Sequence, residues 1–500
     1  MTDEQEQELR KRWLWWRFAL RYGIGLVVLV FYVTTSFHFQ YTPDDTYVYL
    51  QYGRNIARGE GFSFNVGTPS YGITSPVWAL LIAGGTKLSL DPYIVAKTLD
   101  IVFASLAVIG VLAFAFVMIR DRIYALIAAW IFSFDAWYLR WSGSGLESSL
   151  AVLLVVLTLW YAYRKEYVTA AFIVGILTLV RPEGVLLFLA VLVDAYFNAR
   201  GRRAAIRAIV GSFFLYTVVV GCWMIYTFVE FGTIVPNALA SAWGDGPSVA
   251  TVGNGLISDF KLVGATQFVL AGFLVLGVAL TFWRREILVL REEGFPLLWL
   301  LSMPMLTVLM DVHVASRSLL LVMPVVVIYG VWGLKRLEVA SYVTPRRGLT
   351  ILMVVAGISL FQNQLVYRLL VIPQMENFET GATECLKPMA YWLRSNTPEG
   401  SSVLTPDPGI IGYVSERTVY DAAGRITPEV RKAFEERQDR EGVMEMKYDS
   451  LFHPDYVIDS SPVAGRLTSD KLSPVMTRPF SGAGSANTGA LFYTLYKVIK

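Results

Sequence analysis

The sequence predicts a mainly α-helical, polytopic membrane protein that ends in a small soluble α/β domain. Of its 500 residues, 55% are hydrophobic and only 17% are charged, whereas a soluble domain exposes more charge. Apolar stretches of the length that crosses a bilayer core recur up to about residue 370. Beyond that point, short apolar runs alternate with Pro, Gly and charged residues. The predicted domains are therefore 1–372, within the membrane, and 373–500, outside it.

About eleven transmembrane helices account for the apolar stretches. They are predicted at 18–38, 94–118, 123–139, 148–163, 167–180, 185–198, 208–229, 266–283, 295–311, 318–333 and 349–370. The first outer loop, 39–93, contains two further segments with helical patterns, "DDTYVYLQYGRNIARGEG" and "SPVWALLIAGGTKL". Both are expected to lie on the membrane surface.

The basic residues give the orientation. Lys and Arg collect in short cytoplasmic loops, and the clusters "LRKRWLWWR", "RGRRAAIR" and "KRLEVASYVTPRR" all fall on one side if the N-terminus is cytoplasmic. No small-residue cleavage site follows the first apolar stretch, so we expect a retained anchor. An odd number of spans then places the C-terminal domain outside the inner (cytoplasmic) membrane, in the periplasm or its equivalent.

Composition narrows the possible partners. The net charge is only +3, and no basic patch outside the cytoplasmic loops indicates a nucleic acid partner. The two cysteines, Cys222 in an apolar segment and Cys385 in the polar tail, are not expected to pair.

An acid pair, Asp44 and Asp45, directly follows the first span on the outer face. One interpretation is structural, because an aspartate pair is well suited to the N-terminus of a helix. The other is chemical, because a carboxylate can deprotonate a hydroxyl group. Asp pairs also bind divalent cations through oxygen, so Mg²⁺, Mn²⁺ or Ca²⁺ at this pair is an open alternative.

Other ionisable residues lie on the same face in apolar surroundings. They are Glu147, Arg181, Glu183, Asp311, His313 and Arg317. Any one of them alone could be an interfacial anchor or an internal ion pair, and for His313 that interpretation is favoured. Charges near membrane depth usually face a cavity or a partner, and arginines bind phosphate through paired hydrogen bonds. Together they predict transfer of a group from a lipid phosphate to an alcohol.

The sequence resembles the GT-C superfamily of integral membrane glycosyltransferases, in the branch of arabinofuranosyltransferases and protein mannosyltransferase-like enzymes. The resemblance rests on "DDTYVYLQYGRNIARGEGFSFNVGTPSYGITSPVW", "SGLESSL", "LVRPEG", "FGTIVPNALASAW", "SRSLLLVMP" and the tail segment "WLRSNTPEGSSVLTPDPGIIGYVSERTVYDAAGRITPE". Each motif is weak alone, but their order through most of the chain is specific. The residues that flank the Gly before Thr-Ser-Pro differ from those common in the family, and the family's Lys after the outer Pro-Asn is absent. The resemblance therefore implies the reaction class and not the substrate.

The resemblance implies a polyprenyl-phosphate-monosaccharide donor and a hydroxyl acceptor on a glycan, glycolipid or protein, with inversion at the sugar carbon. By motif position, Asp44 would be the general base and Asp45 its neighbour. Glu147 and Glu183 would hold the acceptor, the sugar or a cation. The donor phosphate would be bound by a set of basic residues, namely Arg54, Arg181, Arg317 and His313. A non-catalytic relative of the same fold and, less favoured, a transporter or flippase are the alternatives.

Overall fold

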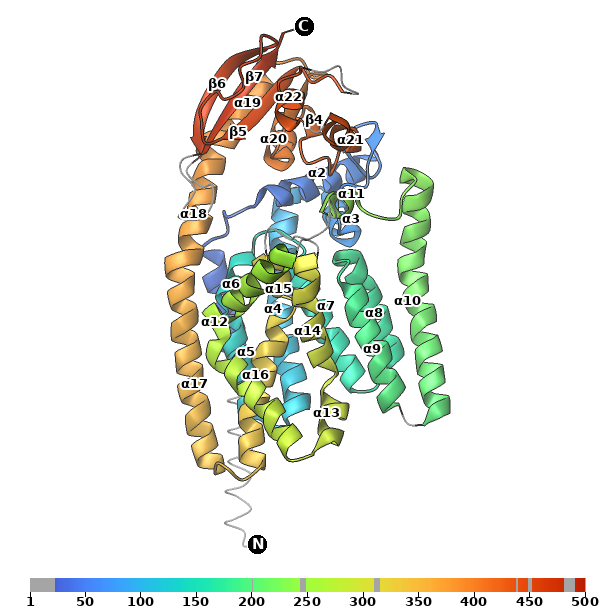
Figure 1. Cartoon of the computed structure of the whole chain (residues 1–500), viewed down its shortest axis with the longest axis vertical. Coiled ribbons are helices and arrows are strands. Elements are labelled where there is room, and N and C mark those ends of the chain that lie inside the picture. The colour runs from blue at the N-terminus through green and yellow to red at the C-terminus, as the bar shows by residue number, and fades with distance from the viewer. Residues whose placement is uncertain are drawn as a thin grey trace.

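The computed structural model of the chain describes residues 23–199, 201–242, 249–309, 315–437, 439–447, 452–480 and 491–499. A tall bundle of helices carries a small sheet at one end, and the helix α2 (Asp44–Arg58) lies between the two parts (Figure 1). The turn between α16 (Met323–Val339) and α17 (Pro345–Val366) is at the opposite end of the bundle.

Helices dominate the described residues before 400. In the bundle they are Gly23–Ser36, α4 (Pro92–Ile119), α5 (Arg122–Ser133), α6 (Ala136–Trp141), α7 (Ser148–Tyr163), α8 (Tyr167–Val180), α9 (Gly184–Asn198), α10 (Arg202–Phe231), α11 (Asn237–Ala242), α12 (Val249–Trp283), α13 (Ile287–Glu293), α14 (Phe295–Leu309), α15 (Ala315–Leu319), α16 and α17. Four described helices are long and apolar enough to cross a membrane: Pro92–Ile119, Arg202–Phe231, Gly253–Trp283 and Pro345–Asn396. Shorter apolar helices accompany them. The mainly helical class is confirmed, and the number of eleven spans stays a prediction.

Polar caps explain where several helices begin. Asp91 accepts hydrogen bonds from the backbone N–H groups of the first turn of α4, and Asp121 does the same for α5. Asp135 caps α6 in the same way. The single helix predicted at 123–139 is therefore divided into α5 and α6, because Asp135 starts a new helix directly after α5 ends.

The two surface helices of the first outer loop are present as α2 and α3 (Pro76–Lys87). α2 ends at Gly59, whose φ of 84° closes the helix in the left-handed region that glycine tolerates. A short hairpin, β1 (Ser63–Asn65) with β2 (Thr68–Pro69), connects the two helices. α2 thereby lies across the end of the bundle.

A single long helical segment connects the bundle to the C-terminal part. It runs from Pro345 to Asn396 through α17, the π-helical turn η1 (Tyr367–Val371), α18 (Ile372–Gly381), a second π-helical turn η2 (Ala382–Leu386) and α19 (Lys387–Asn396). The domain boundary predicted after residue 372 falls inside this segment. The junction is thus helical and not a flexible linker.

The C-terminal part contains a five-stranded sheet of strand order β4-β3-β5-β7-β6. Its strands are β3 (Ser402–Thr405), β4 (Thr418–Asp421), β5 (Tyr456–Ser461), β6 (Leu472–Phe480) and β7 (Leu491–Val498). The helices among them are α20 (Pro408–Ser415), α21 (Pro428–Arg437) and α22 (Arg440–Met444). β3 is parallel to β4 and β5, whereas β7 is antiparallel to β5 and β6. The connection from β3 through α20 to β4 brings α20 against α2 (Figure 1).

Glycine allows α12 and α16 to cross at very short range. A Cβ atom added to Gly333 would lie 2.0 Å from the carbonyl oxygen of Phe273, and one added to Gly277 would lie 2.5 Å from the Cα of Gly333. Small residues let the backbones of membrane helices approach and pack in this way. The close crossing therefore requires glycine, which has no side chain, at positions 277 and 333.

We expect Gly333→Ala to separate α12 from α16 and to lower the stability of the purified protein by about 2 kcal/mol, as over-packing does. The measurement is a thermal melt in detergent. Gly357→Ala is the matched control, because no atom lies within 4 Å of the added Cβ on α17. Equal melting temperatures for the two variants would contradict the close crossing.

Candidate functional site

The two acids at the start of α2 point to different places. The carboxylate of Asp44 accepts hydrogen bonds from the backbone N–H groups of Gly409 (3.0 Å) and Ile410 (2.7 Å), at the N-terminus of α20. The carboxylate of Asp45 instead accepts from Nη1 of Arg317 at 3.0 Å. Asp44 is therefore a cap that joins α2 to the C-terminal part, and Asp45 belongs to a separate cluster of charges.

Asp44 is enclosed as well as bonded. Burial, together with the nearby carboxylate of Asp407, raises the pKa of Asp44 to about 8, and the two N–H bonds oppose this shift. Gly409 packs closely against the backbone of Asp44, since a Cβ atom added to Gly409 would lie 2.0 Å from the carbonyl oxygen of Asp44. Both oxygens of Asp44 therefore face the N-terminus of α20.

Asp45 faces a cavity between two arginines. Its side chain keeps 45% of its surface accessible, and it lines a cavity of about 260 Å³. Nη1 of Arg425, from the segment after β4, lies 3.4 Å from its second oxygen. Burial raises the pKa of Asp45, but the positive charges of Arg317 and Arg425 outweigh burial and place the pKa below the ordinary value of 3.8. Asp45 is therefore a carboxylate at neutral pH.

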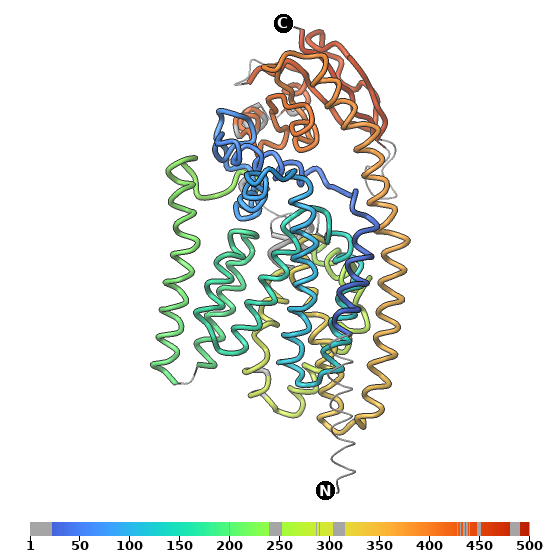
Figure 2. The backbone as a smooth tube through the Cα atoms, turned by 180° about the vertical axis from the view of Figure 1, so that it is seen from behind, coloured from blue at the N-terminus to red at the C-terminus, as the bar shows by residue number. Residues whose placement is uncertain are grey.

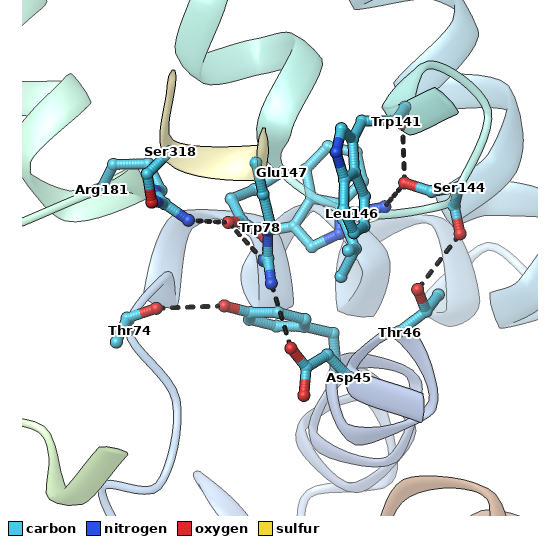
Figure 3. Close-up of polar contacts among 12 residues, drawn as sticks. Asp45, Thr46, Thr74, Trp78, Trp141, Ser144, Leu146, Glu147, Arg181 and Ser318 are labelled. Carbon is cyan, nitrogen blue, oxygen red and sulfur yellow. Dashed lines mark hydrogen bonds and ion pairs between the residues drawn. The ribbon is translucent and has the colours of Figure 1, made fainter. Parts of the chain in front are cut away.

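A chain of alternating charges continues from Asp45 into the bundle. Arg317 donates through Nη2 to both oxygens of Glu147, at 2.7 and 2.8 Å. Arg181 donates to Glu147 at 3.3 Å and to Glu183 at 2.7 Å, and its Nη2 also reaches the hydroxyl of Ser318 at 2.9 Å. Figure 3 shows Glu147 near Arg181 and Ser318, with Asp45 on the side of α2. Glu147 is fully buried, and two arginines compensate its charge.

The loop before Glu147 is held by a second buried charge pair. Lys97, on α4, donates to the carbonyl oxygens of Tyr41 (2.5 Å) and Gly143 (2.7 Å). Asp100, one turn later, accepts from the N–H groups of Gly143 and Gly145, both at 2.9 Å. This pair fixes the entrance to α2 and the turn before Glu147 relative to each other.

Close packing at the same turn explains its glycines. Gly145 has a φ of 86°, and a Cβ atom there would lie 2.8 Å from the side chain of Thr46. Thr46 donates to the carbonyl oxygen of Ser144 at 3.1 Å, and Trp78 of α3 donates to that of Gly145 at 3.0 Å (Figure 3). The turn is thus bonded to both surface helices.

The structure brings together five of the predicted site residues. They are Asp45, Glu147, Glu183, Arg181 and Arg317. Four of these line the cavity, and Glu147 lies behind it and pairs with both arginines. His313 and Asp311 lie outside the described residues.

Arg54, predicted to bind the donor phosphate, does not line the cavity of Asp45, and its role stays a prediction. Its guanidinium forms an ion pair with Glu416 at 3.2 Å, donates to Gln51 and lies 4.5 Å over the ring of Tyr413. These partners fasten the middle of α2 to α20. Asp44, predicted to be the base, also does not line this cavity, and each of its oxygens accepts a hydrogen bond from α20; its role as base stays a prediction.

Arg425 is the site residue that the sequence did not indicate. It lines the cavity and is oriented by Asp421, which accepts from its Nε at 3.2 Å. Asp421 ends β4, and Asp407 follows β3, so the carboxyl ends of two parallel strands face the cavity. Side chains at this edge of a parallel sheet commonly form ligand sites, and the tail motif "YDAAGRITPE" could have pointed there.

The acid pair does not suit a divalent cation. Asp44 and Asp45 turn away from each other, each towards its own donors. Among the described residues, no group of three or more His, Cys, Asp or Glu side chains is arranged to hold a metal ion. The positive charge available to a ligand in the cavity is that of the arginines.

The C-terminal part of the chain matches one protein family model. A family model described as "Domain of unknown function (DUF8728)" matches residues 374–496. A search of curated proteins with the sequence finds no match.

The whole chain resembles several solved structures in fold. The oligosaccharyltransferase of Archaeoglobus fulgidus matches with a TM-score of 0.59 at 13% identity, over 87% of this chain and 69% of its own. ArnT from Cupriavidus metallidurans, bound to undecaprenyl phosphate, matches with a TM-score of 0.52 at 10% identity, over 94% and 97%. The arabinofuranosyltransferase AftD from Mycobacteria matches at 0.51 and 15% identity, over 96% of this chain but 40% of its own. At 10–15% identity, these matches show that the chain shares the fold of these membrane glycosyltransferases, as the resemblance in the sequence implies.

The cap by Asp44 can be tested through hydrogen exchange. We expect Asp44→Ala to speed amide exchange of Gly409 and Ile410 about tenfold, because each amide loses a hydrogen bond worth about 0.5–1.5 kcal/mol. The measurement is hydrogen–deuterium exchange by mass spectrometry over residues 408–415. Asp91→Ala removes a comparable cap from α4 and should leave this segment unchanged. Equal exchange in both variants would show that Asp44 does not hold α20.

Proposed function

We propose that this protein is a glycosyltransferase that moves a monosaccharide from a polyprenyl-phosphate-linked donor to a hydroxyl acceptor on a glycan, glycolipid or protein. The observation that carries the proposal is the cavity in which the carboxylate of Asp45 lies beside Arg317 and Arg425, with Arg181 on the same wall. Sugar transfer from a phosphate needs a base for the incoming hydroxyl and positive charge at the departing phosphate. The GT-C fold supports the same class of reaction.

Asp45 takes the role of general base. It is the member of the acid pair that lines the cavity, and it is ionised at neutral pH because of its arginine neighbours. In the proposed step, the acceptor oxygen bonds to the sugar's anomeric carbon as the bond from that carbon to the phosphate oxygen breaks. The hydroxyl proton passes to Asp45, and the electron pair leaves with the polyprenyl phosphate. A direct displacement of this kind inverts the anomeric carbon.

The arginines receive the donor phosphate. Arg181 and Arg317 line the cavity, and the Nε atom of each has no hydrogen-bond partner among the residues that the structure describes. Arg425 adds a third cation from the C-terminal part. Guanidinium groups bind phosphate oxygens with charge-assisted bonds, which stabilise the leaving group without a metal. Glu147 positions Arg181 and Arg317 from behind, and Glu183 lies at the cavity wall where it can contact the sugar or acceptor.

The proposed setting is the outer face of the inner membrane. Eleven spans with a cytoplasmic N-terminus place residues 373–500 outside, as the distribution of Lys and Arg predicts. The cavity lies where α2 meets the C-terminal part, and the basic turn between α16 and α17 is at the far end of the bundle (Figure 1). A lipid-carried sugar and an external acceptor would meet at that surface.

The base assignment predicts a difference between the two neighbouring acids. We expect Asp45→Asn to lower transfer by about 10²–10⁴-fold, the usual contribution of a general base. Asp44→Asn should cost much less, because asparagine still caps a helix. The measurement uses purified full-length protein, a panel of radiolabelled polyprenyl-phosphate monosaccharides and crude envelope acceptors.

Each outcome of this assay is informative. A larger loss in Asp44→Asn than in Asp45→Asn would return the base role to Asp44. Wild-type protein that binds the lipid donors and transfers no sugar from any of them would contradict the proposed reaction and favour a non-catalytic member of the fold.

The pKa of Asp45 predicts the acid side of the pH profile. Because this pKa is lowered, the base form persists as pH falls, and kcat/KM should not decline between pH 7 and pH 5 through Asp45. Arg425→Gln removes one stabilising charge and should move the acid limb to higher pH. The profiles are compared in an Asp44→Asn background, which removes the titration of Asp44. An unchanged limb in Arg425→Gln would contradict the coupling of the two residues.

A further inference from the structure

A second cavity lies at the edge of the bundle. It has a volume of about 420 Å³ and lies among the helix Gly23–Ser36 with the turn after it, α5 and the α17–η1 segment. Figures 1 and 2 show the first of these helices and α17 side by side at one edge, with α10 at the other. Among the described residues, its lining shares no member with the cavity of Asp45.

Two polar side chains that line this cavity have no hydrogen-bond or ion-pair partner among the described residues. Arg368 lines it and is exposed, and it forms no ion pair with any described residue. Tyr367, next to it, is 4% exposed, and its buried hydroxyl has no hydrogen-bond partner among the described residues. His38 packs edge-on against the Tyr367 ring, with 5.9 Å between the ring centroids. Buried hydroxyl groups usually form a hydrogen bond. The hydroxyl of Tyr367 lacks one and lines the same cavity as Arg368, which indicates a site for a ligand with acceptor oxygens.

The backbone is irregular at the same place. Tyr367 and Arg368 begin the π-helical turn η1 within the long helical segment. Such turns are uncommon and are frequent at functional sites, because they change the direction in which side chains leave the helix. Here the turn occurs where the cavity is lined by both residues.

The remaining wall and the adjacent surface are apolar. Trp130 and Phe134 of the α5 side line the cavity, and Phe37 lines it while being 79% exposed. On α17 and η1, Phe361 and Leu369 are each 71% exposed. A ligand here has an anionic head near Arg368 and a hydrocarbon chain along these side chains, which is the form of a membrane lipid.

We propose that this cavity binds the phosphate headgroup of a membrane lipid through Arg368, with the hydroxyl of Tyr367 as a second donor. One chain of the lipid lies along the exposed apolar side chains of the helix Gly23–Ser36 and α17. This site is separate from the proposed transfer site, and lipid occupancy here does not depend on Asp45.

The test measures lipid retention by full-length protein with native mass spectrometry. The probes are phosphatidylglycerol, undecaprenyl phosphate and diacylglycerol, which has chains but no phosphate. We expect Arg368→Gln to weaken retention of one phosphate-bearing lipid about tenfold, since a charge-assisted bond is lost. Tyr367→Phe should weaken it severalfold without loss of stability, because the hydroxyl has no protein partner. Arg347→Gln, at the other end of α17, is the matched control.

The outcomes separate the sources of the phosphate. Loss of one bound phosphatidylglycerol in Arg368→Gln supports a bulk phospholipid, and loss of one bound undecaprenyl phosphate supports a carrier lipid. Retention that is unchanged in both Arg368→Gln and Tyr367→Phe overturns the proposal. So does equal retention of diacylglycerol by the wild type, since the headgroup would then not be recognised. Asp45→Asn should leave this retention unchanged, which keeps the result independent of the transfer assay.

Discussion

The buried carboxylate of Glu147 is the constraint around which the outer end of the bundle is organised. A charge that is fully removed from water must be paired, and loss of one partner of a buried pair costs about 3–5 kcal/mol. Glu147 uses Arg317 from α15 and Arg181 from the end of α8, so three segments distant in sequence must meet. Arg317 then donates through its other terminal nitrogen, Nη1, to Asp45. The position of the cavity carboxylate follows from the pairing beneath it.

The C-terminal part contributes residues to the candidate site. It contacts α2 through the cap on Asp44, the ion pair between Arg54 and Glu416, and the approach of Arg425 to Asp45. The first two contacts are structural, and the third changes the electrostatics of the cavity. Because α17 continues as helix into this part, the sheet cannot swing freely relative to the bundle. Residues that are more than 350 positions apart in the sequence thus line the same cavity.

The sequence predicts local features well and distant partners poorly. The helix at 167–180 was foreseen to the residue, because a continuous apolar run there is bounded by charged residues at both ends. The cluster of Glu147, Arg181 and Arg317 was foreseen as a group, because charges in apolar surroundings require partners. The ion pair of Arg54 was not foreseen, since its partner Glu416 is 362 residues away and nothing near Arg54 reveals it. Arg425 was missed for the same reason.

The acid pair at 44 and 45 shows how helix geometry divides two adjacent residues between two tasks. Successive side chains on an α-helix are about 100° apart, so Asp44 and Asp45 leave α2 in different directions. Asp44 faces the N-terminus of α20, where a carboxylate satisfies free N–H groups. Asp45 faces the arginines of the cavity. The two interpretations of the pair are therefore compatible, because Asp44 is a structural cap and Asp45 is the proposed base. The cap also holds α20, and with it the C-terminal part that carries Arg425, against α2.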